Sequence, residues 1–123
     1  MNNRAIGKAY EEQAAKWLEQ QHMTILERNY RCRSGEIDLI GLQEHYLVFV
    51  EVKYRSTEGI GNPAEAVGRM KQQKICQVAD YYRMTHEHLG HMGIRYDVVA
   101  ICGEELTWYP NAFFHISSRG YSW

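Results

Sequence analysis

The stretch GEIDLIGLQEHYLVFVEVK, residues 35–53, decides the fold because it holds two extended apolar segments joined by a short polar loop. Its second segment, residues 46–53, carries apolar side chains on both faces, which is typical of a central strand that is covered on both sides. Its first segment, residues 36–40, predicts the strand that pairs with it. The stretch therefore predicts a β-hairpin at the centre of a sheet.

Asp38, Glu51 and Lys53 interrupt the apolar pattern of this hairpin at the margin of the expected core. Glu51 and Lys53 share one face of their strand because side chains two residues apart point the same way. Asp38 meets Glu51 when the hairpin loop has an even number of residues. A four-residue loop, residues 43–46, sets the two opposite each other, with side-chain roots about 5 Å apart. Two carboxylates so placed repel each other unless one is protonated or a cation joins them.

A hard divalent ion is the simplest way to relieve that repulsion, since carboxylate and carbonyl oxygens are its preferred ligands. We expect Mg²⁺, or Mn²⁺ in its place, to bind Asp38, Glu51 and the backbone carbonyl of Val52. Such an ion lowers the pKa of a bound water and stabilises charge on a phosphoryl group. Lys53 would orient the attacking water, help to deprotonate it or neutralise the developing oxyanion. The alternative is a strand-end ion pair of Glu51 and Lys53, with Asp38 merely nearby.

Periodicity predicts the remaining elements: helices over 4–21 and from Asn62-Pro63 to about Thr85, and strands over 24–32, 94–102 and 106–109. Pro63 suits the first turn of a helix, and Pro110 is expected to end the last strand. The order is αβββαββ, an α/β fold in which helices flank a mixed β-sheet. The length of 123 residues predicts a single domain over residues 1–123.

The two helices place further charged side chains near the hairpin. Glu11 lies at the edge of the apolar stripe of the first helix and can supply a third carboxylate, although a solvated position is the alternative. On the second helix, Lys71 and Lys74 fall about 40° and about 20° from Val67 on a helical wheel, inside the apolar stripe. Lysines there either extend outward to solvent or reach a phosphate beside the carboxylates.

Basic side chains on or near these elements are candidates to contact the phosphates of a nucleic acid. The nucleic-acid-binding candidates are Arg31, Arg33, Arg55, Lys71 and Lys74. Residues 54–61 form a polar, glycine-containing segment that predicts a loop able to close over a substrate. The whole chain has 14 basic and 15 acidic residues and a formal net charge of −1, so any phosphate binding must be local.

Composition bears on several other classes of protein. No run approaches the ~18 apolar residues of a membrane span, and the charged N-terminus is unlike a signal peptide, so we expect a cytoplasmic protein without membrane association.

Three separated cysteines without a C-x-x-C pair predict free thiols. The histidine spacing of residues 86–91 can hold a metal, but a helix end explains that segment better. Core packing is expected for four C-terminal aromatic residues, Trp108, Tyr109, Phe113 and Phe114.

Taken together, the motifs resemble a known family. GEIDLI at 35–40 and VFVEVK at 48–53 resemble the PD-(D/E)XK nuclease superfamily and, more closely, the YraN family of uncharacterised, endonuclease-like bacterial proteins. The resemblance continues through ILERNYRCR at 25–33, PAEAV at 63–67 and YDVVAI at 96–101. It covers about residues 5–102. An isolated E-x-K is a weak signal, whereas this ordered set of motifs is a strong one.

The resemblance implies a restriction-endonuclease-like fold, similar to archaeal Holliday junction resolvases, and Mg²⁺-dependent hydrolysis of phosphodiester bonds. By motif position, Asp38 resembles the first acidic ligand of the superfamily, Glu51 the second and Lys53 its catalytic lysine. Glu11 resembles the glutamate that the resolvase-like branch carries on a helix, and Lys71 resembles a basic residue of the second helix. Ile37 stands where the superfamily name has proline. Relatives of the resolvase type act as homodimers, so a homodimer is expected as well.

These observations lead us to expect a metal-dependent endonuclease that cuts DNA, with branched and single-stranded DNA as candidate substrates. A nucleic-acid-binding module on the same fold, with little or no cleavage activity, is the first alternative, and the nearly neutral charge favours it. The intact set of Asp38, Glu51 and Lys53 favours the nuclease. A phosphatase or nucleotide hydrolase with the same metal chemistry is a further alternative, although the chain has no P-loop.

Overall fold

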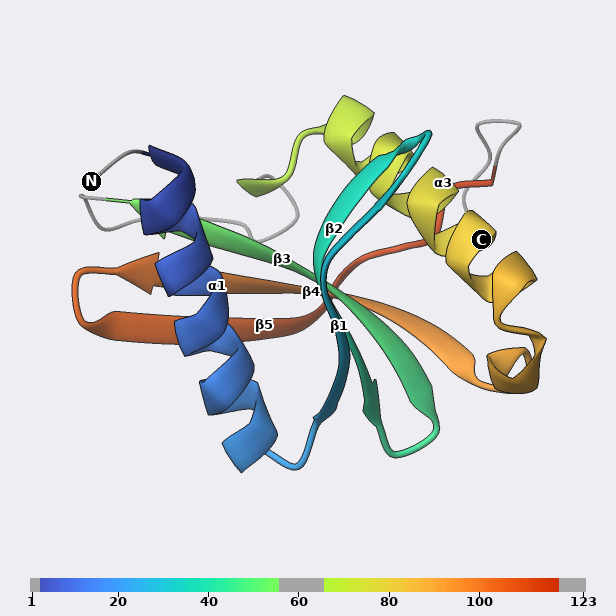
Figure 1. Cartoon of the computed structure of the whole chain (residues 1–123), viewed down its shortest axis with the longest axis horizontal. Helices are drawn as coiled ribbons and strands as arrows, with labels where there is room; N and C mark the ends of the chain where they lie inside the picture. The colour runs from blue at the N-terminus through green and yellow to red at the C-terminus, as the bar shows by residue number, and fades with distance from the viewer. Residues whose placement is uncertain (1–2, 56–65, 118–123) are drawn as a thin grey trace.

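The protein is built around a five-stranded mixed sheet that carries a helix on each face (Figure 1). This computed structural model describes residues 3–55 and 66–117. In chain order the elements are α1 (Asn3–Gln20), β1 (Thr24–Cys32), β2 (Gly35–Gln43), β3 (Tyr46–Arg55), α3 (Arg69–Thr85), the 3₁₀ helix η1 (Glu87–Leu89), β4 (Gly93–Cys102) and β5 (Glu105–Phe113). This order confirms the expected α/β arrangement, αβββαββ, and is consistent with a restriction-endonuclease-like core.

The strands lie side by side in the order β1-β2-β3-β4-β5. β3 and β4 run parallel, whereas the other neighbouring pairs are antiparallel. A parallel pair cannot be joined by a tight turn, and α3 lies in the connection between β3 and β4. β3 is therefore the central strand, as its apolar residues on both faces predict.

Each face of the sheet has its own apolar core. On one face, Ala14, Ala15 and Leu18 of α1 pack with side chains that include Val48 and Val50. On the other face, the core joins side chains of α3 to the alternate residues of the same strands: Ile75, Val78, Ala79 and Tyr82 with Ile40, Leu47 and Phe49. Burial of both faces of β3 lasts until Val52, so charged side chains near that point lie where both cores end.

The hairpin of β2 and β3 has the predicted register but a shorter turn. Leu42 pairs with Leu47 as expected, and Gln43 also pairs with Tyr46. The turn therefore has two residues rather than four, and its first residue, Glu44, has a φ of 55°. Positive φ at this position is typical of the two-residue turns whose twist matches that of a hairpin. Both loop lengths are even, so the faces of the two strands are the same in either case.

The start and phase of α3 differ from the prediction. The expected start at Asn62-Pro63 lies outside the described residues. α3 begins at Arg69 after an extended Gly68, so Val67 is buried ahead of the helix and does not set its helical phase. Met70 is 72% exposed, and the buried face of the helix includes Ile75, Val78 and Tyr82. The wheel angles of Lys71 and Lys74 from Val67 therefore do not apply, and both lysines are exposed, as the alternative of outward extension predicts.

β5 runs through Pro110 to Phe113, so the expectation that Pro110 ends this strand was wrong. β5 is an edge strand, and a proline there need not break the ladder because its missing N–H can face away from the sheet. Asn111 follows with a φ of 55°, close to a register shift in the pairing with β4. Phe113 is buried as expected, whereas Phe114 is exposed and does not pack in the core.

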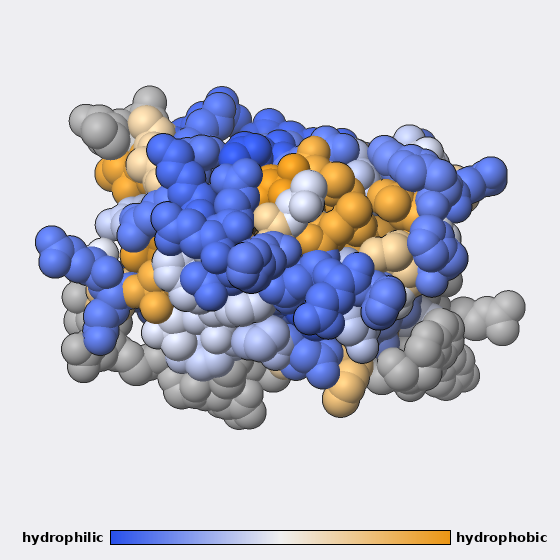
Figure 2. Space-filling view, turned by 90° about the horizontal axis from the view of Figure 1, so that it is seen from below, coloured by the Kyte–Doolittle hydropathy of each residue, from blue (hydrophilic) through white to orange (hydrophobic). Residues whose placement is uncertain are grey.

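The surface of the molecule combines polar and apolar areas. Seen from below, hydrophilic side chains surround an apolar area (Figure 2). Among the described helices, none is both long and apolar enough to cross a membrane. All three cysteines are free, as expected, and Cys76 is buried.

Candidate active site

Carboxyl groups from three elements converge where β2 and β3 separate. Asp38 comes from β2, Glu51 from β3 and Glu11 from α1. The ladder between the two strands ends at Leu39 and Val50, so Asp38 and Glu51, next in register, are not paired through their backbones. The Asp38 carboxylate instead accepts a hydrogen bond of 2.8 Å from the backbone N–H of Val52. Asp38 thereby lies between the two strands and faces both glutamates.

Burial controls the protonation of this cluster. Glu51 is 7% exposed, and burial, together with the hydrogen bond and the charge of Asp38, raises its pKa to about 9. Burial and the charge of Asp38 also raise the pKa of Glu11, to about 7. A buried carboxyl group stays protonated because the charged form loses its hydration. At neutral pH, Glu51 is therefore an uncharged acid that shares its proton with Asp38.

Two lysines lie beside the buried acid. Lys71 Nζ of α3 is 3.6 Å from Glu51 Oε2, and Lys53 follows Glu51 on the same face of β3. The positive charges of Lys71 and Lys53 both act to lower the Glu51 pKa, but burial and Asp38 outweigh them. Glu51 Oε2 and Glu11 Oε1 are buried and accept no hydrogen bond within the described residues. The cluster therefore has acceptor oxygens whose bonding capacity is unused, which is uncommon for buried groups.

Asn29 of β1 belongs to the cluster, although it was not predicted from the sequence. The register of β1 with β2 pairs Arg28 with Leu39 and Tyr30 with Ile37, which places Asn29 opposite Asp38. Its φ is 52°, and its side chain hydrogen-bonds with Glu11 and thereby lowers the pKa of that carboxyl group. Asparagine tolerates the left-handed region better than most residues. An asparagine within a strand pattern was the signal available in the sequence, because the residue is depleted in strands.

The donor chemistry of the cluster fits a hard divalent ion. Carboxylate oxygens are the ligands that such ions prefer, and the unused oxygens of Glu11 and Glu51 are available for one. In the described part of the chain, however, no group of three or more His, Cys, Asp or Glu side chains is arranged as a metal site. The carboxyl groups hydrogen-bond with Asp38 instead. Val52 faces the cluster with its N–H, and ligation by its carbonyl stays a prediction.

The predicted nucleic-acid-binding residues are scattered around this cluster. Lys71 contacts Glu51, and Arg31 Nε forms an ion pair of 2.9 Å with Glu36 across the β1–β2 hairpin. The other three are exposed on separate elements and form no ion pair within residues 3–55 and 66–117: Arg33 in the β1–β2 turn, Arg55 at the end of β3 and Lys74 on α3. Most of the predicted loop 54–61 lies outside the described residues.

The histidine segment, residues 86–91, lies at the C-terminal end of α3. His86 stacks on Tyr82 with ring centroids 3.8 Å apart, and its Nδ1 hydrogen-bonds with the Tyr82 carbonyl at 2.8 Å. The following residues form η1 rather than a longer helix end. The segment therefore caps α3.

Comparison with known proteins identifies the family. Residues 10–101, which hold all three carboxyl groups, match the model of the uncharacterised protein family UPF0102. A UPF0102 protein of Lachnoclostridium phytofermentans is 43% identical over 113 residues, covering 92% of this chain and 96% of the relative. A UPF0102 protein of Saccharophagus degradans is 45% identical over 100 residues, covering 81% and 85%. A third, from Fusobacterium nucleatum, is 40% identical over 111 residues, covering 90% and 92%. The chain therefore belongs to the UPF0102 family, which is the YraN family that its motifs resemble.

Proposed function

We propose that this protein is a metal-dependent endonuclease that hydrolyses phosphodiester bonds in DNA. The observation that carries the proposal is the convergence of Glu11, Asp38 and Glu51 from three elements, with Lys53 and Lys71 beside them. A buried carboxyl group with a pKa of about 9 costs stability that an apolar side chain would not. Strongly shifted groups of this kind cluster at functional sites more than elsewhere.

Each side chain has a role in this proposal. Asp38, Glu51 and Glu11 would hold Mg²⁺ or Mn²⁺ through their carboxylate oxygens, with the Val52 carbonyl as a further candidate. When bound, such an ion supplies Lewis acidity and lowers the pKa of a coordinated water. Lys53 would position the attacking water and move its proton, and Lys71 would offset negative charge at Glu51 and on the phosphate. The resemblance to PD-(D/E)XK nucleases supports the same assignment for Asp38, Glu51 and Lys53.

A cleavage assay tests this proposal directly. Labelled linear duplex, single-stranded and four-way junction DNA would be incubated with Mg²⁺, with Mn²⁺ or with chelator. Wild-type protein is expected to give products only with the cations, and Glu51→Gln and Lys53→Ala are each expected to reduce the rate about 100-fold or more. Glu104→Gln and Lys16→Ala, which change exposed residues away from the cluster, are the matched controls. Products that persist in both site variants would come from a contaminant and contradict the assignment.

Two observations favour a second function, a nucleic-acid-binding module without cleavage. Arg31 and Lys71, both predicted to contact phosphates, are already engaged with Glu36 and Glu51. The net charge of −1 also gives little general attraction to a polyanion. DNA binding by wild-type protein that Glu51→Gln and Lys53→Ala leave unchanged, without products under any cation, would establish the module instead of the nuclease.

A further inference from the structure

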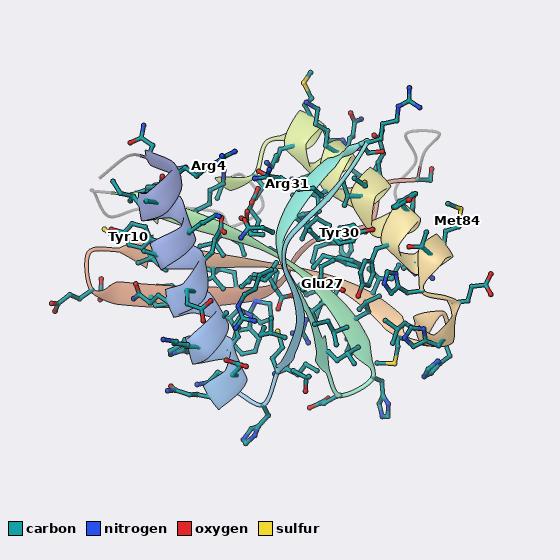
Figure 3. The ribbon with its side chains drawn as sticks, in the orientation of Figure 1. Arg4, Tyr10, Glu27, Tyr30, Arg31 and Met84 are labelled. Atoms are coloured by element: carbon teal, nitrogen blue, oxygen red, sulfur yellow. The ribbon has the colours of Figure 1, made fainter. Side chains whose placement is uncertain are left out.

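An open cavity of about 350 Å³ lies beside the carboxylate cluster, between the first turns of α1 and the β1–β2 hairpin. Three basic side chains line it, namely Arg4 and Lys8 of α1 and Arg31 of β1. Figure 3 shows Arg4 and Arg31 on either side of this space. Glu11 and Asn29 also line the cavity, so it is continuous with the candidate active site.

The cavity carries an excess of positive charge. Arg31 is engaged with Glu36, which also lines the cavity, so these two charges offset each other. Arg4 and Lys8 are exposed, and within the described residues neither forms an ion pair. They are four residues apart on a helix and therefore lie on the same side of it. Glu11 is the remaining acid, so even with Glu11 charged the cavity is lined by three basic and two acidic side chains.

Gly7 leaves room on the helix between the two basic residues. A Cβ added at Gly7 would meet nothing closer than the hydroxyl of Tyr54, 4.0 Å away. Packing of the described residues therefore does not require glycine there, although glycine inside a helix is unfavourable. A long side chain at this position would project into the cavity, which Gly7 lines. The glycine thus keeps open a space that the protein does not fill.

The dimensions suit an extended polyanion better than a small anion. Arg4 and Glu11 are seven residues apart on α1, about 10 Å along the helix axis. That length is about three times the 3.4 Å at which the charges of one strand recur along the duplex axis, so it exceeds the size of a single phosphate group. A strand whose reacting phosphate lies at Glu11 and Asp38 can therefore continue past Lys8 to Arg4.

We propose that this cavity is a phosphate-binding track for a DNA strand, in which Arg4 and Lys8 hold the backbone next to the phosphate at the carboxylates. The proposal rests on the proposed function, because the strand must pass the carboxylate cluster. It assigns to Arg4 and Lys8 of α1 a phosphate-binding role that was not predicted from the sequence. The contacts are to phosphates and carry no base specificity.

Binding measurements without cleavage test the track. Fluorescence anisotropy of a labelled single strand and of a labelled duplex would be measured in chelator over a range of salt concentrations. Arg4→Gln and Lys8→Gln are each expected to weaken binding equally for different sequences. Each should also reduce the slope of log affinity against log salt concentration by about 1. Lys16→Gln, an exposed lysine farther along the same helix, is the matched control and should change neither quantity.

A second variant tests the track without changing charge. Gly7→Leu is expected to weaken DNA binding at least several-fold and to lower the salt slope, because a filled cavity keeps the strand away from Arg4 and Lys8 although both residues remain. Circular dichroism would verify that the variant keeps its helix content. Wild-type affinity and slope in Arg4→Gln, Lys8→Gln and Gly7→Leu together, or no DNA binding by wild-type protein, would overturn the track.

The two proposals fail in different ways. Cleavage that Glu51→Gln abolishes, combined with wild-type DNA binding by Arg4→Gln and Lys8→Gln, would refute the track and leave the nuclease standing. Weakened binding in those two variants, combined with no cleavage by wild-type protein under any cation, would support the track as part of a binding module.

Discussion

Glu51 holds a proton at neutral pH because its carboxyl group is buried beside Asp38, and its pKa is raised to about 9. In the unfolded chain the same group titrates near 4.5. Between these values the folded protein binds a proton that the unfolded chain has released, so the free energy of unfolding falls as pH rises. Glu11, with a pKa of about 7, acts in the same direction over the lower part of that range. Without a cation, the cluster therefore destabilises the protein as the solution becomes alkaline.

Glu51→Gln is expected to remove most of this pH dependence, because the amide has the same shape and does not titrate. In chelator, the free energy of unfolding of the variant relative to wild type should increase by on the order of 2 to 4 kcal/mol between about pH 5 and about pH 8. Urea titrations at both pH values measure it. Glu104→Gln, at an exposed turn position, serves as the control and should follow wild type. Equal pH dependence in all three proteins would show that Glu51 titrates normally.

Cation binding should be coupled to release of this proton. An ion that takes Glu51 as a ligand must displace its proton, so the affinity for Mn²⁺ should rise with pH, by at most about tenfold per pH unit while Glu51 remains protonated. Calorimetry in buffers of different ionisation enthalpy would count the protons released. Glu51→Gln should bind Mn²⁺ much more weakly and release fewer protons. Affinity that does not vary between neutral and alkaline pH would exclude Glu51 as a ligand.

The carboxylates of the cluster could be predicted from the sequence, whereas Asn29 could not, and the difference has a physical reason. Asp38, Glu51 and Lys53 interrupt apolar segments, and an even loop length suffices to put Asp38 and Glu51 together, whatever the turn is. Asn29 joins the cluster through a positive φ, which depends on pairing between β1 and β2. Lys71 was identified as a basic residue near the cluster, but the helical phase that suggested it was wrong, because Gly68 separates Val67 from α3.

At the scale of the secondary-structure elements, α1 contains a glycine, Gly7, which is an unfavourable residue inside a helix. Gly7 lies inside the helix, and a Cβ added there would meet nothing closer than the Tyr54 hydroxyl, 4.0 Å away. Glycine in a helix interior is less favourable than alanine, since it loses more backbone freedom on folding. α1 carries Glu11, so the stability of this helix bears directly on the geometry of the site.

Gly7→Ala is expected to stabilise the protein by about 0.5 to 1 kcal/mol, because the added methyl group meets no close neighbour and the unfolded chain loses freedom. Urea unfolding monitored by circular dichroism would measure the gain. Gly103→Ala provides the contrast, since Gly103 has a φ of 61° and alanine there is strained even though its surroundings are open. Unchanged stability in Gly7→Ala would mean that the start of α1 contributes little to folding, and a loss would mean that the added methyl group is not accommodated.

Periodicity predicted every described strand, but not where β5 ends or how α3 begins. Apolar segments define β1 to β4 because burial in the sheet requires them. Pro110 was expected to end β5, and that inference holds only for a strand with neighbours on both sides. Whether a strand lies at the edge is a property of the whole sheet, which the local pattern does not contain. Phe114 was misplaced for a different reason: it directly follows the buried Phe113, and neighbouring residues of an extended chain point to opposite sides.

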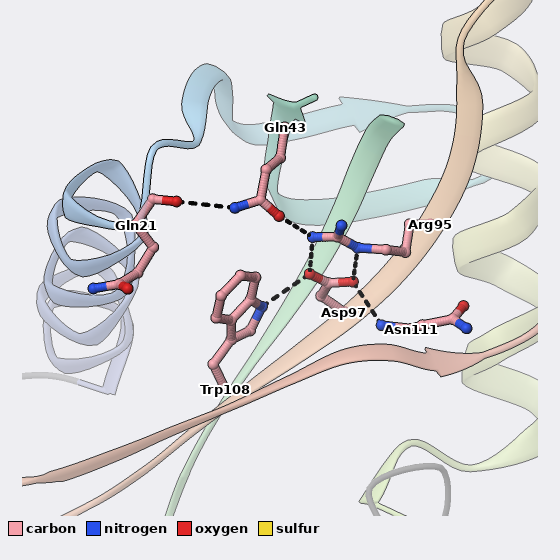
Figure 4. Close-up of polar contacts among 6 residues, drawn as sticks. All are labelled: Gln21, Gln43, Arg95, Asp97, Trp108 and Asn111. Atoms are coloured by element: carbon pink, nitrogen blue, oxygen red, sulfur yellow. Dashed lines mark hydrogen bonds and ion pairs between the residues drawn. The ribbon is translucent and has the colours of Figure 1, made fainter. Parts of the chain in front are cut away.

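At the scale of the whole molecule, a buried charged network links the end of α1 to three strands. Asp97 of β4 is 0% exposed and accepts four hydrogen bonds of 2.9 Å each, from Arg95 Nε, Arg95 Nη2, Trp108 Nε1 and the Asn111 N–H (Figure 4). Arg95 also donates to Gln43 Oε1 at 2.7 Å, and Gln43 donates to the carbonyl of Gln21. β2, which carries Asp38, is thereby tied to β4 and β5.

Asp97→Asn is expected to destabilise the protein strongly. Every group that faces the Asp97 carboxylate is a donor, so an amide NH₂ at this position would point a donor at donors. Arg95, only 14% exposed, would also lose its counter-charge. Removing one partner of a buried pair costs about 3 to 5 kcal/mol, because the other charge stays buried and uncompensated.

An exposed ion pair of similar geometry provides the control for this prediction. Arg28 Nε and Glu12 Oε2 are 2.8 Å apart, but both side chains are more than 40% exposed. Arg28→Ala should therefore cost less than about 1 kcal/mol, since solvent screens the pair and hydrates the carboxylate that remains. Urea unfolding of both variants compares the two environments at nearly equal ion-pair distance. If Asp97→Asn cost no more than Arg28→Ala, the network would be a consequence of the fold rather than one of its supports, and the tie between β2 and β4 would rest on apolar packing alone.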